Sequence, residues 1–187
     1  MKKVAVLLAE GYEEGESLFL IDILRRAQIE CHSVSVDGNE TVTGGHAITA
    51  VADRVLDDSI MAYDMIVLPG GLPGADNLKN NLKVIETVQA FDQDPEKYVA
   101  AICAAPQVLK EAGITTGRKL TSYPADKYRQ MFTDADYRDE IVVVDDHLIT
   151  SQGPATTLAF AYTLVDVLGG DSEPLKTKML YYRLLEQ

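Results

Sequence analysis

A cysteine that directly follows an apolar run is the residue of this sequence best placed for chemistry. The run begins at Tyr98, has the length of a buried strand and ends at Cys103. Pro106 follows shortly afterwards, and proline suits the first turn of a helix. We therefore predict that Cys103 lies at a strand-to-helix corner, where backbone N–H groups and the helix N-terminus lower the pKa of a thiol and stabilise an oxyanion.

The structural alternative for Cys103 is a small buried side chain, since free cysteine is among the most buried residue types. The other cysteine of the chain is Cys31. A lone pair of cysteines in an α/β chain without a leader is most simply interpreted as two free thiols. No cluster of cysteines suggests a metal site, and we expect no metal.

A glycine-rich turn is predicted to approach the cysteine. It follows a short apolar strand at 64–68 and contains Gly70 and Gly71. Adjacent glycine amides carry no side chains, so they can approach a substrate oxygen closely and form an anion hole with the N–H of Ala104. A simple tight turn would need the same glycines, so the turn alone does not decide between the two interpretations.

Three glutamates stand near the start of the first predicted helix. Glu13 and Glu14 suit its solvated N-terminus, which favours carboxylates. Glu16 stands where the loop becomes a buried helix, and from there it could reach across the strand ends to Cys103. A carboxyl held in a dry site has a raised pKa, so Glu16 could keep its proton, donate it to the thiolate and later shuttle a proton to a substrate.

The histidines give little support to cysteine–histidine hydrolysis, which needs an imidazole within hydrogen-bond reach of the sulfur. His32 is predicted in a strand and His147 in a hairpin turn. His46 follows two glycines in a loop, and it is the histidine expected to approach a pocket.

The composition narrows the class of protein. The 187 residues fit one domain, carry a net charge of −12 and have a pI near 4.6. Nucleic acids and anionic membranes demand a basic surface, so we expect neither as a partner. No apolar segment has the length of a membrane span and no secretory leader is expected, which favours a cytoplasmic location.

Strands alternate with helices along the chain. Apolar runs predict strands at 3–9, 29–36, 64–68, 98–103 and 119–122, and hairpins at 41–50 and 141–151. Helices are predicted at 17–27, 82–91, 127–131, 155–168 and 174–185. This alternation indicates an α/β fold, a flavodoxin-like three-layer α/β/α sandwich with a mostly parallel sheet. Ligand sites in such folds lie beyond the carboxyl ends of the strands, where the loops carrying Glu16, Gly70 and Cys103 would meet.

Four motifs carry a resemblance to a known family. They are Glu13-Glu14-x-Glu16, the Val-Leu-Pro-Gly-Gly segment at 67–71, Ala-Ala-Ile-Cys-Ala-Ala-Pro at 100–106 and Leu-Ile-Thr-Ser-Gln-Gly-Pro at 148–154. Together they resemble the ThiJ/PfpI superfamily, in the branch that holds YajL and the Parkinson-associated protein deglycase. The resemblance covers essentially the whole chain, as a single domain over residues 1–187.

The resemblance implies a site and an assembly. Cys103 matches the low-pKa, oxidation-prone cysteine of the family and Glu16 the carboxylic acid bonded to it. The surrounding backbone amides correspond to Gly70, Gly71 and Ala104. Further pocket positions are Tyr123, His46 and Pro154. The family is similar in fold to flavodoxins, and its members commonly form homodimers through the first helix. The apolar residues from Leu18 to Leu24, which lie on almost every side of that helix, agree with such an interface.

Several positions depart from the family pattern. Ala104 stands where the peptidase branch has a histidine, so a peptidase would lack its base. Tyr123 stands where several relatives have a histidine. His46 occupies an arginine position, and Ala155 replaces a usual glycine.

The leading hypothesis is a cysteine-dependent, cofactor-independent enzyme that acts on reactive dicarbonyls or glycation adducts, like the glyoxalases and deglycases of the family. It would convert methylglyoxal to lactate with Cys103 as nucleophile and Glu16 as proton shuttle. One alternative is a non-enzymatic redox sensor or chaperone in which Cys103 is oxidised by peroxide. A weaker alternative is a small-molecule hydrolase of the amidase type.

Overall fold

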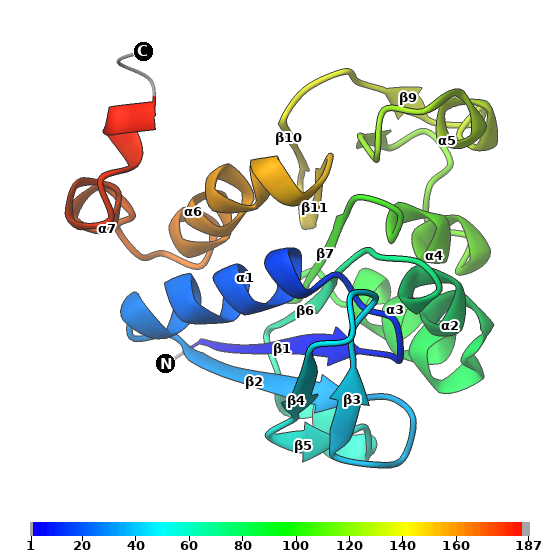
Figure 1. Ribbon diagram of the computed structural model, residues 1–187. Coiled ribbons are helices and arrows are strands. Elements are labelled where there is room, and N and C mark those ends of the chain that lie inside the picture. Colours follow the sequence, from blue (N-terminus) through cyan, green and yellow to red (C-terminus); the bar gives the residue numbers. More distant parts are fainter. Residues whose placement is uncertain (1, 185–187) are drawn as a thin grey trace.

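The chain forms a twisted sheet covered by helices on both faces. The computed structural model describes residues 2–184 (Figure 1). The sheet has the strand order β10-β11-β7-β6-β1-β2-β5. In that order its strands are Val142–Asp145, Leu148–Ser151, Tyr98–Ile102, Met65–Leu68, Lys3–Leu8, Glu30–Ser35 and Arg54–Val55. All neighbouring strands are parallel except the pair β10 and β11. This arrangement confirms the predicted fold class.

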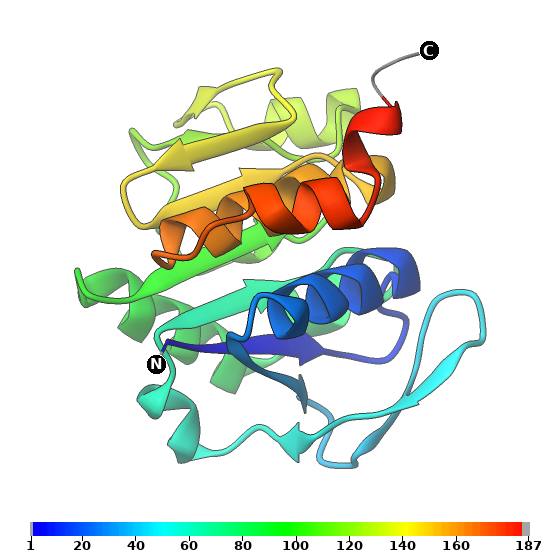
Figure 2. The ribbon, with the colours of Figure 1, turned by 90° about the vertical axis from the view of Figure 1, so that its left-hand side faces the viewer.

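Two small ribbons lie outside the main sheet. An antiparallel hairpin consists of β3 (Thr41–Thr43) and β4 (Thr49–Val51), as the sequence predicts. Figure 2 shows this hairpin extending beyond the end of the sheet. The segment expected as a strand at 119–122 is the short β8 (Lys119–Leu120), which pairs with β9 (Asp136–Tyr137) instead of joining the main sheet.

The helices form the two outer layers. They are α1 (Glu14–Arg26), α2 (Gly74–Asn80), α3 (Leu82–Gln93), α4 (Pro106–Glu111), α5 (Asp126–Met131), α6 (Thr157–Val167) and α7 (Glu173–Lys178). Short 3₁₀ turns lie at η1 (Asp58–Ala62), η2 (Pro154–Thr156) and η3 (Tyr181–Leu184). No helix within residues 2–184 is both long and apolar enough to span a bilayer.

Each face of the sheet has its own apolar core, because successive strand residues point to opposite faces. Along β1, Val4 and Val6 pack with α1 and α6, whereas Ala5 and Leu7 pack with α3 and α4. All four of these residues are fully buried. The central strands are therefore rigid supports for the loops at their carboxyl ends.

Three helices differ most from the sequence predictions. Helix α1 begins at Glu14 and not at Ser17, since the Ser17 N–H already bonds to the Glu13 carbonyl at 3.1 Å. Helix α2 begins inside the glycine-rich turn that was expected to be irregular, because the Ala75 N–H bonds to the Gly71 carbonyl at 2.9 Å.

The third difference is at the C-terminal end. The helix predicted at 174–185 ends at Lys178, and Leu180 follows with a positive φ of 61° that interrupts it. Residue 185 lies outside the described residues.

Candidate active site around Cys103

Cys103 lies at the corner between β7 and α4. Its φ of 64° places it in the left-handed region, which is unfavourable for a residue with a side chain. The corner is held on both sides. The Cys103 N–H donates to the Ser151 carbonyl at 3.0 Å, and its carbonyl accepts from the Tyr123 N–H at 2.8 Å. The strained conformation turns the thiol toward the carboxyl end of the sheet.

Glu16 approaches this corner from the first turn of α1. Its side chain is buried, with 1% of the residue exposed, and Oε2 accepts from the Gly70 N–H at 2.7 Å. Its other oxygen, Oε1, is buried and has no hydrogen-bond partner among the described residues. A buried oxygen without a partner is costly for an ionised carboxyl, so this environment favours the protonated acid.

Gly70 lies between the acid and the thiol. A Cβ on Gly70 would stand 2.6 Å from the Cys103 Cβ and 2.8 Å from Glu16 Oε2, both far inside van der Waals contact. The absence of a side chain at Gly70 is therefore what lets the two functional groups share one small space.

Burial raises the pKa of Glu16 from 4.5 to about 7, against the lowering effects of the Gly70 N–H and the Cys103 thiol. Glu16 consequently exchanges a proton near neutral pH, as a proton shuttle requires.

The pKa of the Cys103 thiol is raised, which corrects the sequence expectation of a lowered pKa. Burial is the largest cause, and the Glu16 charge adds to it. Hydrogen bonds from the Ala104 and Gly71 N–H groups act in the opposite direction. Helix α4 has six residues and begins beyond Ala105, so its N-terminus gives little help. Because the Glu16 charge disappears when that carboxyl is protonated, the two groups titrate as a coupled pair.

A cavity of about 310 Å³ opens in front of the thiol. It is lined by Glu13, Gly45, His46, Gly71, Leu72, Cys103, Ala104, Tyr123, Lys127 and Tyr128. The structure therefore brings His46 and Tyr123 to the same cavity as Cys103. Pro154 is not among the lining residues; it begins η2 directly after Gly153, and it is Gly153 that approaches the Tyr123 ring. Lys127 and Tyr128 were missed, since nothing in their spacing distinguishes them from ordinary residues of α5.

The sequence suggested that Glu14 lies at a solvated helix start, but in the structure its side chain is buried. It is 4% exposed, because the turn between β3 and β4 folds over its carboxylate. The N–H groups of His46 and Ile48 donate to Oε1 at 2.7 and 3.3 Å, and the His46 ring lies 2.9 Å from Oε2 through Nδ1. Gly44 permits this fold, since a Cβ there would lie 2.3 Å from Glu14 Oε1.

Glu14 and His46 shift each other's pKa. Burial opposes ionisation of Glu14, but the hydrogen bonds from His46 and Ile48 outweigh it and lower the pKa of the carboxyl. The Glu14 carboxylate in turn raises the pKa of His46.

Glu13, Glu14 and His46 each offer one possible ligand atom, and these atoms lie within 4.8 Å of one another. The cluster has enough ligands for a metal ion, but Glu14 already has hydrogen-bond partners at both oxygens.

Comparison with known proteins gives a consistent result. Residues 2–167 match the model of the DJ-1/PfpI family. The chain is 38% identical over 173 residues to the Parkinson disease protein 7 homolog of Danio rerio, with 90% of each chain covered. It is 31% identical over 174 residues to the glutathione-independent glyoxalase DJ-1 of Schizosaccharomyces pombe, with 89% of this chain and 91% of the relative covered.

Solved structures agree with these sequence matches. The crystal structure of a mutant DJ-1 superfamily protein from Salmonella typhimurium superposes with a TM-score of 0.87 at 36% identity, and 97% of each chain is covered.

Proposed function

Because this chain belongs to the DJ-1/PfpI family, we propose that it is a cofactor-independent enzyme that converts methylglyoxal and related small dicarbonyls to hydroxy acids. The observation that carries this proposal is the buried pair of Cys103 and Glu16 on either side of Gly70, with a Glu16 pKa near 7. The glyoxalase name of the fission-yeast relative supports the substrate class.

The first step is addition of the thiol to the aldehyde carbon. Glu16 in its carboxylate form, which a pKa near 7 makes accessible, takes the Cys103 proton. The sulfur bonds to the aldehyde carbon and the carbonyl oxygen becomes an oxyanion. The N–H groups of Gly71 and Ala104, which already act on the sulfur, would stabilise that charge. The Gly70 N–H, predicted for the same role, is instead bonded to Glu16 Oε2. Glu16 then returns the proton to the oxyanion, which leaves a hemithioacetal.

The second step is an isomerisation. Glu16, now a carboxylate, removes the proton from the carbon bonded to sulfur and delivers it to the neighbouring carbonyl carbon. The hydroxyl proton moves to the neighbouring oxygen, so the hemithioacetal becomes a lactoyl thioester with the same atoms. No external oxidant or reductant is required.

The third step is hydrolysis. Water adds to the thioester carbonyl, the carbon–sulfur bond breaks, and lactate and the Cys103 thiol are released. The overall reaction joins one methylglyoxal and one water to give one lactic acid.

The requirement for Cys103 is tested by following lactate formation without glutathione for the wild type, Cys103→Ser and Cys31→Ser. We expect Cys103→Ser to lose at least about 10²-fold in kcat/KM, as removal of a covalent nucleophile does. Cys31 is buried on β2 and is not among the residues that line the cavity, so Cys31→Ser should retain turnover. Equal activity of the two variants would refute the nucleophile.

A second candidate function is a redox sensor or chaperone of oxidative stress. It is supported by the difference between the two cysteines, since Cys103 reaches the cavity surface whereas Cys31 is buried. An amidase-type hydrolase receives less support, since no imidazole hydrogen-bonds to the Cys103 sulfur among the described residues.

We further propose a homodimer through the Leu18 to Leu24 region. Leu18 and Phe19 on α1 are 43% and 51% exposed, and large apolar side chains on one helix favour an interface. The net charge of −12 supports a small-molecule ligand over nucleic acid. A single domain over residues 1–187 and a cytoplasmic location stay predictions.

A further inference from the structure

Hydrolysis of the thioester needs a base that none of the steps above assigns. Glu16 is fully enclosed and bonded to Gly70, so it has little room for an attacking water on its own side of the sulfur. The cavity is lined by Cys103 and His46, and Glu16 is not among its lining residues. At roughly 30 Å³ per water, its volume of about 310 Å³ leaves space for water beside a three-carbon acyl group.

His46 has the setting of an oriented base in that cavity. Its Nδ1 lies 2.9 Å from Glu14 Oε2, and the backbone N–H of the same residue donates to Glu14 Oε1 at 2.7 Å. These two contacts fix the ring from the backbone and from one nitrogen. A carboxylate at Nδ1 holds the proton on that nitrogen, so Nε2 is left as the proton acceptor.

Nε2 of His46 is available for this role. It has no hydrogen-bond partner among residues 2–184, and the side chain is 71% exposed while it lines the cavity of Cys103. Glu14 makes no ion pair with a lysine or arginine in this part of the chain, so its charge acts on the imidazole.

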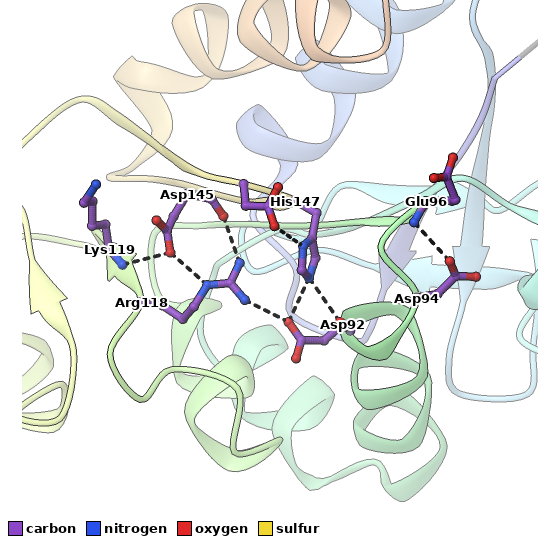
Figure 3. Close-up of polar contacts among 8 residues, drawn as sticks. Asp92, Asp94, Glu96, Arg118, Lys119, Asp145 and His147 are labelled. Carbon is purple, nitrogen blue, oxygen red and sulfur yellow. Dashed lines mark hydrogen bonds and ion pairs between the residues drawn. The ribbon is translucent and has the colours of Figure 1, made fainter.

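His147 provides the contrast (Figure 3). It also lies between two carboxylates, but both of its ring nitrogens are engaged: Nδ1 with Asp146 at 3.2 Å and Nε2 with Asp92 at 3.1 Å. Arg118 also pairs with Asp92 at 3.2 Å. This cluster joins the end of α3 to the turn between β10 and β11, and it has no free nitrogen to accept a proton.

We propose that His46, oriented by Glu14, is the general base that hydrolyses the lactoyl thioester on Cys103. Nε2 takes a proton from a cavity water as the water oxygen bonds to the thioester carbonyl carbon. The carbon–sulfur bond then breaks, and the imidazolium proton passes through cavity water to the leaving sulfur. Glu14 is the positioning residue. The inference rests on the proposed glyoxalase reaction and assigns its last step.

The test is to look for the acyl-enzyme in His46→Gln. Since general-base catalysis contributes about 10²–10⁴-fold, we expect thioester hydrolysis to slow by about 10²-fold while the first two steps continue. The variant should release little lactate and accumulate one acyl group on Cys103. A thioester, unlike a reversible hemithioacetal, survives removal of free methylglyoxal and is cleaved by hydroxylamine to a hydroxamate, so mass spectrometry before and after hydroxylamine identifies it.

Two further variants sharpen the test. Glu14→Gln should also accumulate the thioester, because it loses the charge that orients the ring. In His46→Ala, added imidazole should restore lactate release, which a merely structural histidine would not allow. His147→Gln is the matched control and should turn over without accumulating the adduct.

Three results would overturn the inference. One is wild-type turnover by His46→Gln without a trapped thioester, which would leave hydrolysis to Glu16 or water alone. Another is a lack of rescue by imidazole in a folded His46→Ala. The third is loss of wild-type activity on addition of a chelator, which would assign Glu13, Glu14 and His46 to a metal ion. If the wild type itself forms no lactate, the proposed function fails first, so the two failures are distinguishable.

Discussion

The Gly70 N–H donates to Glu16 Oε2 at 2.7 Å, and this bond fixes the acid beside the thiol corner. It joins the loop after β6 to the first turn of α1, two segments far apart in sequence. The same glycine leaves room for Cys103 on its other side. One residue without a side chain thus determines the separation of nucleophile and proton shuttle.

Replacing Gly70 by alanine should damage both stability and activity. The new Cβ would overlap the Cys103 Cβ and Glu16 Oε2, and overpacking of this kind costs about 1–3 kcal/mol. We expect urea denaturation to show that loss and lactate formation to fall with it. Gly15→Ala is the control, because its Cβ would meet only Glu13 Oε1 at 3.7 Å and alanine favours a helix. A Gly70→Ala variant as stable and active as Gly15→Ala would contradict the close packing.

The raised pKa of Glu16 predicts a pH dependence of stability. The folded state binds this proton more tightly than the unfolded state, so the contribution is fully present below pH 4.5 and is lost as pH rises through about 7. The shift corresponds to about 3 kcal/mol between those limits. Urea unfolding at pH 5 and pH 8 should show wild-type stability falling relative to Glu16→Gln, which carries no ionisable group there. Parallel pH profiles of the two proteins would mean that Glu16 is not perturbed.

The sensor function predicts selective oxidation. Under mild peroxide, Cys103 should gain oxygen faster than Cys31, because Cys103 reaches the cavity surface whereas Cys31 is buried. Mass spectrometry of peptides containing each residue measures the two rates. Oxidation of both cysteines at the same rate would contradict the sensor function. The raised pKa of Cys103 also predicts that its reaction with peroxide becomes faster as pH rises.

The dimer proposal predicts a change of mass in solution. Light scattering of the wild type should give twice the chain mass of 20.5 kDa. The double variant Leu18→Glu and Phe19→Glu places two charges on the exposed side of α1 and should give the monomer mass. Leu82→Glu, on a residue that is 78% exposed at the start of α3, is the control and should leave the mass unchanged. A wild-type monomer would refute the interface.

The sequence was sufficient to predict those parts of the fold and of the site that local patterns decide. The apolar run from Tyr98 and the proline at 106 placed Cys103 at its corner, and the alternation of strands and helices gave the fold class. Contacts between distant segments were not predictable in this way. Glu14 is buried by a hairpin turn more than 30 residues along the chain, and nothing near Glu14 signals it. The direction of the Cys103 pKa likewise depends on burial and on the Glu16 charge, not on the corner alone.

The most direct test of the account is lactate formation by Glu16→Gln from methylglyoxal carrying deuterium on the aldehyde carbon. A glutamine can neither remove nor deliver a proton, so the account predicts that the variant forms lactate at least about 10²-fold more slowly. The wild type should form lactate rapidly, with a rate lowered by the deuterium that Glu16 must remove. Lactate formation by Glu16→Gln at the wild-type rate would contradict the shuttle and with it the proposed reaction.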